Sequence, residues 1–468
     1  MNENIICAVS TPPGVGGVAV IRISGVGSID LADKIFMAKN GKQLAETPAN
    51  SVVFGQIFNC EDTENNTQLV DEVLVSVFRT PHSFTGEDTV EISCHGSAYI
   101  QQSILQLLLE KGARLAEAGE FTRRAFFNGK MDLSQAEAVA DLIASTSAAA
   151  HRMALNQMRG GFSSELQALR SRLLDFVSLV ELELDFSEED VEFADRSQLK
   201  ELAAGIEKKI EKLSDSFRLG NALKNGIPVA LVGETNVGKS TLLNVLLNED
   251  KAIVSDIHGT TRDVIEDTVN IKGITFRFID TAGIRNTKDK IENLGIERTY
   301  QKIEQASIVL WLVDGTQVSE RIEWLTERIA KRAEGKKIIL VFNKIDKISS
   351  EELDVLNQLF EVFEAERIYI SAKNKTHIEK LQNALIKASQ LPEICPGDVV
   401  ISNVRHYNAL RKALVSIQRV SEGLDNDVSG DFLSQDIREC ISYLGEITGQ
   451  ISNDEILGNI FGKFCVGK

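Results

Sequence analysis

Residues 233–241 read Gly-Glu-Thr-Asn-Val-Gly-Lys-Ser-Thr, which is the complete G-x-x-x-x-G-K-S/T spacing of a phosphate-binding loop. The apolar run Ile227–Val232 precedes this loop and a helical run, 242–247, follows it, so the pattern predicts strand, loop and helix in that order. The two glycines let the backbone N–H groups point at phosphate oxygens, and the helix N-terminus adds positive potential. We expect Lys239 to bind the outer phosphates of a nucleotide and the Ser240 hydroxyl to ligate Mg²⁺.

Two further segments have the composition of switch regions that respond to the γ-phosphate. Residues 259–263 read Gly-Thr-Thr-Arg-Asp, and Thr261 can close over the γ-phosphate and the Mg²⁺ ion as its second protein ligand. An apolar strand at 274–279 ends in Asp280-Thr281-Ala282-Gly283. We expect Asp280 to lie in the outer sphere of the Mg²⁺ ion and the Gly283 amide to contact the γ-phosphate.

The base specificity follows from residues 343–346, which read Asn-Lys-Ile-Asp after an apolar run at 338–342. The Asp346 carboxylate can accept hydrogen bonds from guanine N1–H and from the exocyclic amine, whereas adenine would leave it unpaired. Ser-Ala-Lys at 371–373 follows another short apolar run and forms the third wall of a guanine pocket. The residues predicted to bind GTP are Asn236, Val237, Gly238, Lys239, Ser240, Thr241, Ser255, Asp256, Ile257, His258, Gly259, Thr260, Thr261, Asp280, Thr281, Ala282, Gly283, Asn343, Lys344, Asp346, Ser371, Ala372 and Lys373.

The whole chain has 468 residues and a formal net charge of −17, which is long enough for about three domains. This acidic balance excludes a global basic field for nucleic-acid binding, so any RNA contact must be local or made through a partner. The six cysteines are scattered without C-x-x-C pairs, which argues against a zinc site and fits reduced thiols. The sequence shows neither a signal peptide nor an apolar span of membrane length, so we expect a soluble, cytoplasmic protein without membrane association.

The elements that must position these residues indicate a multidomain α/β plus all-α protein. Residues 1–120 read as mixed α/β, with strands at 5–9, 18–23, 52–57, 73–78 and 90–92 and a helix at 98–110. Helical patterns fill 121–225, with a capping box expected at Ser134-x-x-Glu137, and they return at 390–468. The economical reading is one helical-bundle domain, split in sequence, into which a Ras-like P-loop GTPase domain at 226–389 is inserted.

Several stretches outside the GTPase motifs carry a family resemblance. They are the residues 11–14, 21–25, 83–88, 119–122 and 125–130, and the ending Phe-Cys-Val-Gly-Lys at 464–468. With them the chain closely resembles the MnmE (TrmE) family of tRNA-modification GTPases along essentially its whole length. The ending has Val466 at the variable place of the family's terminal Cys-Ile/Leu/Val-Gly-Lys.

The resemblance implies that residues 1–120 form a domain similar to the tetrahydrofolate-binding modules of one-carbon enzymes, through which the protein forms a homodimer. It also implies a hetero-oligomer with an FAD-binding partner, MnmG. Together the two proteins would add a (carboxymethyl)aminomethyl group to C5 of the wobble uridine of certain tRNAs. The one-carbon unit would come from a tetrahydrofolate derivative, either 5-formyl- or 5,10-methylene-.

The family's folate-contacting positions correspond to Arg22, Glu91, Lys130 and Lys468. A pterin presents a guanine-like donor edge that the Glu91 carboxylate can read, and an anionic glutamate tail suits Arg or Lys. From the sequence alone, charges of this kind are more often surface charges or members of structural ion pairs. Cys465 is placed near the folate by the same resemblance, as a catalytic nucleophile or proton carrier, and a buried inert thiol is the alternative. Its position formally matches a prenylation box, but Gly467 and Lys468 fit that pattern poorly.

Hydrolysis needs a group that orients water and a source of positive charge. Many GTPases have Gln directly after D-x-x-G, but this chain has Ile284 there, and the resemblance implies Glu292 as the catalytic residue. The alternative for Glu292 is a solvent-facing charge. Arg262 and Arg285 can each supply charge in cis. The resemblance instead implies a potassium ion, held by Asn236, Ser255, Ile257 and Thr260 when two GTPase domains meet; the alternative for Asn236 is an ordinary turn residue.

Two rival functions differ from this interpretation. A ribosome-assembly GTPase would carry a basic RNA-binding module after the GTPase domain, and residues 390–468 show no such motif. A GTP-regulated scaffold without folate chemistry stays compatible with the sequence, and binding of 5-formyl-tetrahydrofolate would distinguish it.

Overall fold

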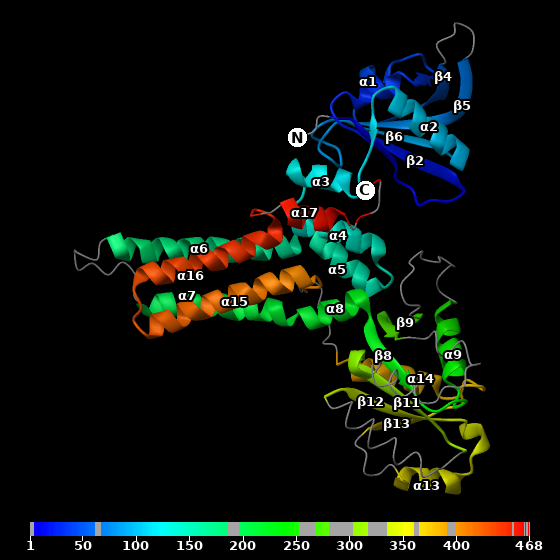
Figure 1. Ribbon diagram of the computed structural model, residues 1–468, viewed down its shortest axis with the longest axis vertical. Coiled ribbons are helices and arrows are strands. Elements are labelled where there is room, and N and C mark those ends of the chain that lie inside the picture. The colour runs from blue at the N-terminus through cyan, green and yellow to red at the C-terminus, as the bar shows by residue number, and fades with distance from the viewer. Residues whose placement is uncertain are drawn as a thin grey trace. The chain divides into compact units, whose positions relative to one another are not determined.

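The computed structural model describes residues 4–60, 67–185, 196–251, 267–279, 303–316, 335–359, 365–390, 399–451, 454–462, 464 and 467 (Figure 1). The chain divides into two compact units. The first contains Met1–Ala140, Gln157–Lys200 and Ser416–Lys468, and the second contains Asp141–Asn156 and Glu201–Val415. Each unit is built around one β-sheet.

The sheet of the first unit has the strand order β3-β4-β5-β6-β2-β1-β7. Its neighbouring strands pair antiparallel, except that β1 and β7 run parallel. The expected strands are confirmed, and the short β3 and β7 are additional to them. The strands are β1 (Ile6–Val9), β2 (Gly16–Ser24), β3 (Phe36–Ala38), β4 (Ser51–Cys60), β5 (Thr67–Phe78), β6 (Thr89–Gly96) and β7 (Arg114–Leu115).

One face of this sheet is covered by α1 (Ser28–Asp33) and α2 (Ala98–Glu110), which lie over the strands in Figure 1. The helix expected at 98–110 is therefore confirmed. Its Ile104, Leu107 and Leu108 are buried against the strands, as the i, i+3, i+4 spacing of an amphipathic helix requires. Because side chains alternate along a strand, every second residue of β2, β5 and β6 joins this core.

The opposite face of the same sheet carries polar and exposed side chains. Arg22 on β2 and Glu91 on β6 are directly opposite each other. Farther along the face, Val52, Phe54 and Leu74 are 62%, 41% and 48% exposed, and Phe54 is the cross-strand neighbour of Leu74. These three side chains form an exposed apolar patch.

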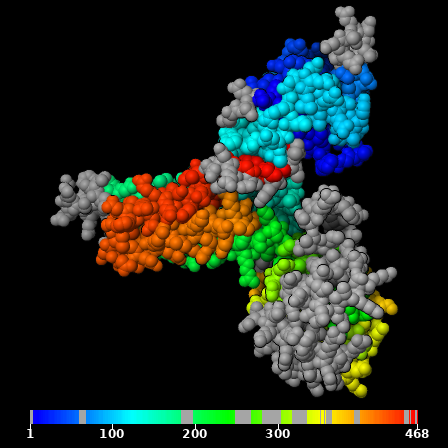
Figure 2. Space-filling view, in the orientation of Figure 1, coloured from blue at the N-terminus to red at the C-terminus, as the bar shows by residue number. Residues whose placement is uncertain are grey.

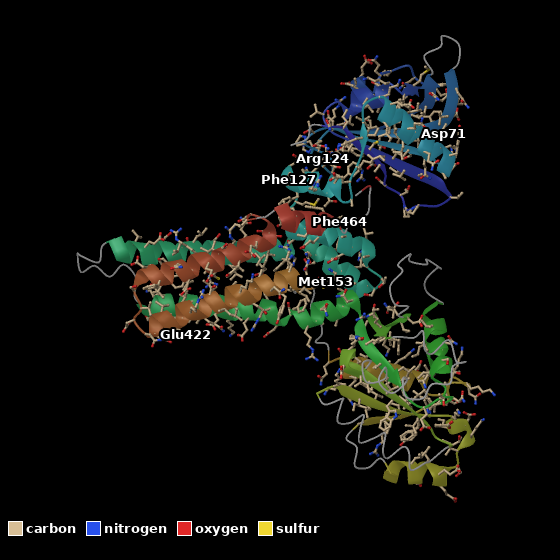
Figure 3. The ribbon with its side chains drawn as sticks, viewed as in Figure 1. Asp71, Arg124, Phe127, Met153, Glu422 and Phe464 are labelled. Carbon is tan, nitrogen blue, oxygen red and sulfur yellow. The ribbon has the colours of Figure 1, made fainter. Side chains whose placement is uncertain are left out.

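The first unit also contains α3 (Glu120–Phe127), α6 (Gly161–Asp185), α16 (Gly430–Thr448) and α17 (Asp454–Phe461). The C-terminal helix α17 packs on α3 (Figure 2). Phe461 joins the two helices, with its ring 6.4 Å from that of Phe126 and 5.6 Å from that of Phe464. Phe464 is labelled near Phe127 and Arg124 of α3 in Figure 3. Helix α17 therefore packs against α3, the helix that follows the N-terminal sheet in sequence.

The start of α4 (Leu133–Ala144) corrects the expected capping box. Asp132, not Ser134, is the cap: its Oδ1 accepts a hydrogen bond from the Gln135 amide at 2.9 Å, and the Gln135 side chain accepts from the Asp132 amide at 2.9 Å. The reciprocal bonds of a capping box therefore form two residues earlier than expected. Packing decides the register, because this start buries Leu133 completely beside Phe461.

The sheet of the second unit has the order β13-β12-β11-β8-β10-β9. All its pairs are parallel except β9 with β10. The expected strand Ile227–Val232 is confirmed as β8, and β11 is a strand that was not expected. The elements are β8 (Ile227–Val232), α9 (Lys239–Lys251), β9 (Asp267–Ile271), β10 (Ile274–Phe278), β11 (Ile308–Asp314), β12 (Lys337–Asn343), α13 (Ser350–Leu359), β13 (Glu366–Tyr369) and α14 (Ile378–Ser389).

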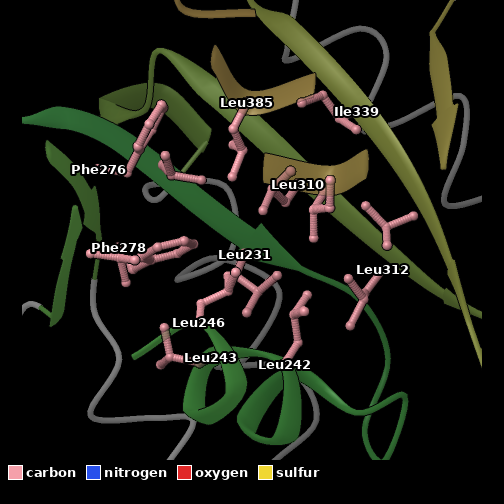
Figure 4. Packing of buried hydrophobic residues seen from close by; sticks show 14 of the residues in the cluster. Leu231, Leu242, Leu243, Leu246, Phe276, Phe278, Leu310, Leu312, Ile339 and Leu385 are labelled. Atoms are coloured by element: carbon pink, nitrogen blue, oxygen red, sulfur yellow. The ribbon is translucent and has the colours of Figure 1, made fainter. Parts of the chain in front are cut away.

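Helices cover both faces of this mainly parallel sheet, as βαβ connections require. On one face α9 contributes Leu242, Leu243 and Leu246, which pack against Leu231 and Phe278 of the strands (Figure 4). On the other face, the cluster contains Leu356 of α13 together with Trp311 and Phe342. Parallel strands of an open α/β sheet end at one edge, and ligands bind outside that edge.

The remaining helices among the described residues are α5 (Ala148–Met158), α7 (Arg196–Asp215), α8 (Phe217–Asn225) and α15 (Val404–Asp425). The segment before β8 and the segment after α14 lie side by side. Ser216 Oγ accepts a hydrogen bond from the Ile401 amide at 3.0 Å, and the rings of Phe217 and Tyr407 stack with centroids 4.5 Å apart. Within the described parts of the chain, no helix has the length and apolarity to cross a membrane.

Candidate functional site

The phosphate-binding loop lies between β8 and α9, at the carboxyl end of the strand. Gly233 and Gly238 have φ angles of +151° and +103°, which side chains other than glycine rarely adopt. A Cβ at Gly238 would be 2.3 Å from Asn343 Nδ2, and one at Gly233 would be 2.4 Å from the Leu312 carbonyl oxygen. Both glycines are therefore needed for backbone conformation and for space.

Lys239 closes this loop upon itself. Its Nζ donates hydrogen bonds to the carbonyl oxygens of Gly233 at 2.7 Å and of Glu234 at 2.5 Å. The ammonium thus lies across the mouth of the loop, where a P-loop lysine meets the outer phosphates. Asn236 has a left-handed φ of +65°, the conformation that the turn interpretation expects of Asn.

Asn343, at the end of β12, ties the phosphate-binding loop to the base-binding segments. Its side chain is 3% exposed. Nδ2 donates to the Val237 carbonyl at 2.8 Å, and Oδ1 accepts from the Ala372 amide at 3.0 Å. A single buried amide therefore fixes the distance between the loop and the 371–373 segment.

Asp346 stands in the 3₁₀ turn Ile345–Lys347 that follows. Ser371 Oγ donates to its Oδ1 at 2.6 Å and is itself held by the Asn374 amide at 3.2 Å. The hydrogen bond from Ser371 lowers the pKa of Asp346. The carboxylate is consequently ionised and oriented, as an acceptor for two base donors must be.

Asp314, at the end of β11, belongs to the same edge and was not expected from the sequence. Its Oδ2 is 2.5 Å from Lys344 Nζ. The signal that could have found it is an acidic residue directly after a buried apolar run, beside the strand that carries Asn343. The structure thus brings together residues 236–241, Asn343, Lys344 and Asp346 with Ser371 and Ala372; Lys373 follows them in the same loop.

Several predicted residues lie outside the described part of the chain. They are Ser255, Asp256, Ile257, His258, Gly259, Thr260, Thr261, Asp280, Thr281, Ala282, Gly283, Glu292, Cys465 and Lys468, and the alternatives Arg262 and Arg285. Their predicted roles stay predictions.

A second cluster of charged side chains lies on the sheet of the first unit. Arg22 and Glu91 form an ion pair in which Nε and Nη2 each lie 2.8 Å from Oε1. The guanidinium lies over the rings of Phe84 and Phe121, 5.3 and 5.6 Å from their centroids. Arg22 and Glu91 therefore form the structural ion pair that was the alternative interpretation of these charges. Both contacts use the same carboxylate oxygen of Glu91, Oε1.

Lys130 and Gly467 border the same region. Lys130 Nζ donates to the Pro81 carbonyl at 2.8 Å, in the loop that also contributes Phe84. Ser10, directly after β1, donates from its hydroxyl to the Gly467 carbonyl at 3.1 Å. A Cβ at Gly467 would be 2.3 Å from the Val9 carbonyl oxygen, so Gly467 lies directly against the end of β1.

A buried network that was not expected stands behind this cluster. Glu120 is 2% exposed and accepts two hydrogen bonds from the Arg114 guanidinium, at 2.8 and 2.5 Å. Burial alone raises the pKa of Glu120, but the hydrogen bonds and charges of Arg114, the Glu117 amide and Arg124 outweigh it and bring the pKa to about 2. Arg124 also bonds Glu87 at 3.0 Å. The network fixes α3 to the loop that carries Phe84.

Three cysteines with described side chains are free and buried: Cys7, Cys94 and Cys440. Burial raises the pKa of Cys7 and Cys94 to about 11 and that of Cys440 to about 12, with Asp71 and Glu439 adding to the rise at Cys94 and Cys440. Thiols with such values carry little thiolate at neutral pH.

Comparison with known proteins gives matches along the whole chain. A family model described as the MnmE helical domain matches residues 133–465, and one described as the GTP-binding protein TrmE N-terminus matches residues 5–130. The chain is 59% identical to a tRNA modification GTPase MnmE of Bacteroides thetaiotaomicron and 52% identical to one of Flavobacterium johnsoniae, and each alignment covers 100% of both chains. A crystal structure of Era with MgGDPNP and nucleotides 1506–1542 of 16S ribosomal RNA matches 40% of this chain and 65% of that chain at 32% identity; its TM-score of 0.28 is too low to support a conclusion.

Proposed function

The chain belongs to the MnmE family of tRNA modification GTPases, and from this premise we propose that it is a potassium-activated GTPase coupled to wobble-uridine modification. The observation that carries the nucleotide part is the meeting of Lys239, Asn343 and Asp346 at one edge of the second sheet. Lys239 and the loop amides bind the phosphates, while Asp346, oriented by Ser371, reads the base. Ser240 and Thr261 supply the protein ligands of a Mg²⁺ ion, a hard cation that takes oxygen ligands.

The guanine assignment has a direct test. Asp346→Asn replaces the carboxylate oxygen that accepts from the exocyclic amine of guanine by an amide N–H donor, so preference should move from GTP towards xanthosine triphosphate, which has a carbonyl oxygen in place of that amine. Competition of both nucleotides against a fluorescent GDP analogue measures the shift. Undiminished GTP affinity in the variant would contradict the assignment.

The hydrolysis step is assigned to a potassium ion and Glu292. Asn236, Ser255, Ile257 and Thr260 would hold the ion, whose positive charge replaces an arginine finger worth about 10³–10⁵ in rate. Turnover should be fast in potassium and slow in sodium, and Asn236→Ala should remove this difference. Glu292→Ala should bind GTP normally and hydrolyse it at least about tenfold more slowly. Equal turnover of the parent in both salts would remove the ion and reopen the case for Arg262 or Arg285.

We assign the folate derivative to Arg22, Glu91, Lys130 and Lys468, with Cys465 beside it. The support is chemical: Glu91 uses only Oε1 towards Arg22, so Oε2 can accept from a pterin, while Lys130 and Lys468 suit an anionic tail. Calorimetric titration with 5-formyl-tetrahydrofolate tests this assignment. Lys130→Ala should weaken binding at least tenfold, and the exposed Lys34→Ala is the matched control. Absence of binding to the parent would favour a GTP-regulated scaffold.

A homodimer formed through the first unit is supported by the exposed apolar patch of Val52, Phe54 and Leu74. Leu74→Ser should shift the mass measured by light scattering from dimer towards monomer. Leu109, an exposed leucine of α2, gives the matched control Leu109→Ser. A dimer that persists in Leu74→Ser would exclude this patch as the interface.

The modification itself would be carried out in the cytoplasm with the FAD-binding partner MnmG, on C5 of the tRNA wobble uridine. We keep the division into 1–120, 121–225, 226–389 and 390–468 as the proposed functional domains. Deletion of the gene followed by nucleoside analysis of bulk tRNA tests the activity. Complementation should restore the modified uridine with the parent chain and fail with Lys239→Ala; unchanged uridines after deletion would contradict the proposal.

A further inference from the structure

We propose that Asp314 is a positioning residue of the guanine pocket: by pairing with Lys344 it keeps that ammonium away from Asp346, whose carboxylate then remains available to the base. The inference rests on the proposed guanine recognition by Asp346 and adds a residue from a different strand to it.

The backbone places Asp314 beside the base-reading segment. In the parallel pair of β11 and β12, Asp314 is the register partner of Asn343. The next residue, Gly315, donates from its amide to the Asn343 carbonyl at 3.0 Å. A Cβ at Gly315 would be 2.0 Å from Ile348 Cδ1. The turn after β11 is therefore pressed against the segment that runs from Asn343 to Ile348.

The Asp314 carboxylate is fixed before it meets Lys344. Oδ1 accepts from the Thr316 amide at 3.1 Å and from Thr316 Oγ1 at 2.7 Å, which directs Oδ2 towards Lys344 Nζ at 2.5 Å. The side chain of Asp314 is 14% exposed and that of Lys344 is 31% exposed, so water screens the pair only in part. Burial raises the pKa of Asp314, but the hydrogen bonds from Lys344 and Thr316 outweigh it and lower the value.

Lys344 has to be held because it is one of several lysines close to Asp346 in the base-binding segments. Lys344 lies two residues before Asp346, and the charges of Lys347 and Lys373 already act on its carboxylate. A carboxylate offers a limited number of acceptor positions. Of its about four positions, one takes Ser371 Oγ and one takes the backbone amide of Asp346 itself, which leaves two for guanine N1–H and the exocyclic amine. An ammonium that turned to Asp346 would occupy a position that the base requires.

The consequence concerns selectivity as well as affinity. Guanine donates two hydrogen bonds to Asp346, whereas hypoxanthine, which lacks the exocyclic amine, donates one. If Lys344 competes for the carboxylate, the bond to the exocyclic amine loses its acceptor, so GDP loses more affinity than IDP. A structural defect of the pocket would weaken both nucleotides equally. The ratio of the two dissociation constants therefore separates positioning from structural support.

The experiment measures GDP and IDP affinities of the full chain by competition against a fluorescent GDP analogue. Asp314→Asn removes the charge and keeps the size; we expect GDP to bind about tenfold more weakly and the GDP-over-IDP preference to fall about fivefold, the scale of one charge-assisted hydrogen bond. Asp314→Glu keeps a carboxylate and should keep the preference within about twofold. Asp354→Asn, on the exposed side of α13, is the matched control and should change neither value.

A second substitution tests the mechanism itself. In Asp314→Asn combined with Lys344→Met the competing ammonium is absent, so the preference should return to that of Lys344→Met alone. Lys344→Met in the otherwise unchanged chain gives a reading that does not depend on how Asp314→Asn folds. Because Lys344 is itself a predicted GTP-binding residue, both nucleotides should bind more weakly, but the GDP-over-IDP preference, which depends on Asp346, should not fall. An unchanged preference in Asp314→Asn, or a lowered one in Lys344→Met, would overturn the proposal.

Asp346→Asn separates the two possible failures. If it does not move preference towards xanthosine nucleotides, the guanine assignment itself is wrong. If it does so while Asp314→Asn leaves the GDP-over-IDP preference unchanged, only the role of Asp314 is wrong.

Discussion

Replacement of Asn343 by alanine tests whether one buried amide assembles the nucleotide site. Asn343 is 3% exposed, and its side chain joins the Val237 carbonyl to the Ala372 amide at 2.8 and 3.0 Å. Alanine would leave both backbone groups without this partner in a buried place. Each loss costs about 1–3 kcal/mol.

The expected effect on nucleotide binding follows from these two bonds. If about 1.5 kcal/mol of each loss is expressed in binding, the total of about 3 kcal/mol weakens GDP affinity roughly 100-fold. The phosphate-binding loop and the base-binding segment would then be ordered separately, so the ligand has to supply the ordering that Asn343 now provides.

The assay is equilibrium titration of the purified full chain with a fluorescent GDP analogue, together with thermal unfolding of the nucleotide-free protein. Asn383→Ala is the matched control, because Asn383 is exposed on α14 and its side chain contacts Lys272 at 2.8 Å, away from the loop. A dissociation constant for Asn343→Ala within about threefold of the parent, with a normal unfolding temperature, would refute the reasoning.

Other outcomes follow from particular contacts. The pKa of Glu120 is about 2 in the folded chain against 4.5 ordinarily. Its ionised form therefore adds about 3 kcal/mol to the free energy of unfolding above pH 4.5, and this stabilisation is lost as the pH falls towards 2. Acid unfolding of Glu120→Gln should lack this pH-dependent loss, and identical acid unfolding of both proteins would contradict it. Gly220→Ala would put a Cβ 2.1 Å from the Ile401 carbonyl oxygen and should destabilise the second unit by about 1–3 kcal/mol in urea unfolding, whereas Gly458→Ala, with open space around its Cβ, should not. Cys7, Cys94 and Cys440, whose pKa values are about 11, 11 and 12, should resist iodoacetamide at pH 8 and react after unfolding, as peptide mass spectrometry would show; rapid labelling of the native chain would mean that these thiols are accessible.

The spacing of neighbouring residues was sufficient to predict much of the nucleotide site. The phosphate-binding loop between β8 and α9 could be predicted because its glycines, lysine and flanking apolar runs are contiguous. The helix α2 could be predicted to the residue, since its apolar positions recur with helical spacing and its ends are marked by polar residues. In both cases the information lies within about a dozen neighbouring residues.

Local sequence patterns did not predict two elements correctly. At the start of α4 two overlapping capping boxes are possible, and β11 has no alternation of apolar and polar residues. Asp132-x-x-Gln135 and Ser134-x-x-Glu137 both fit a capping box, and the burial of Leu133 against α17, more than 300 residues later in the chain, selects the first. The strand β11 is buried on both faces from Ile308 to Val313, so it lacks the alternation that marks a half-exposed strand.

The sequence by itself determined which residues can bind phosphate and recognise guanine. Only the tertiary structure decided which charged side chains form ion pairs. Arg22 pairs with Glu91, and Asp314 pairs with Lys344, because the strands that carry them are neighbours in their sheets. Sequence separations of 69 and 30 residues carry no local signal for either pair. Strand order and register are set by burying whole apolar faces, and the partners of the charged residues follow from that register.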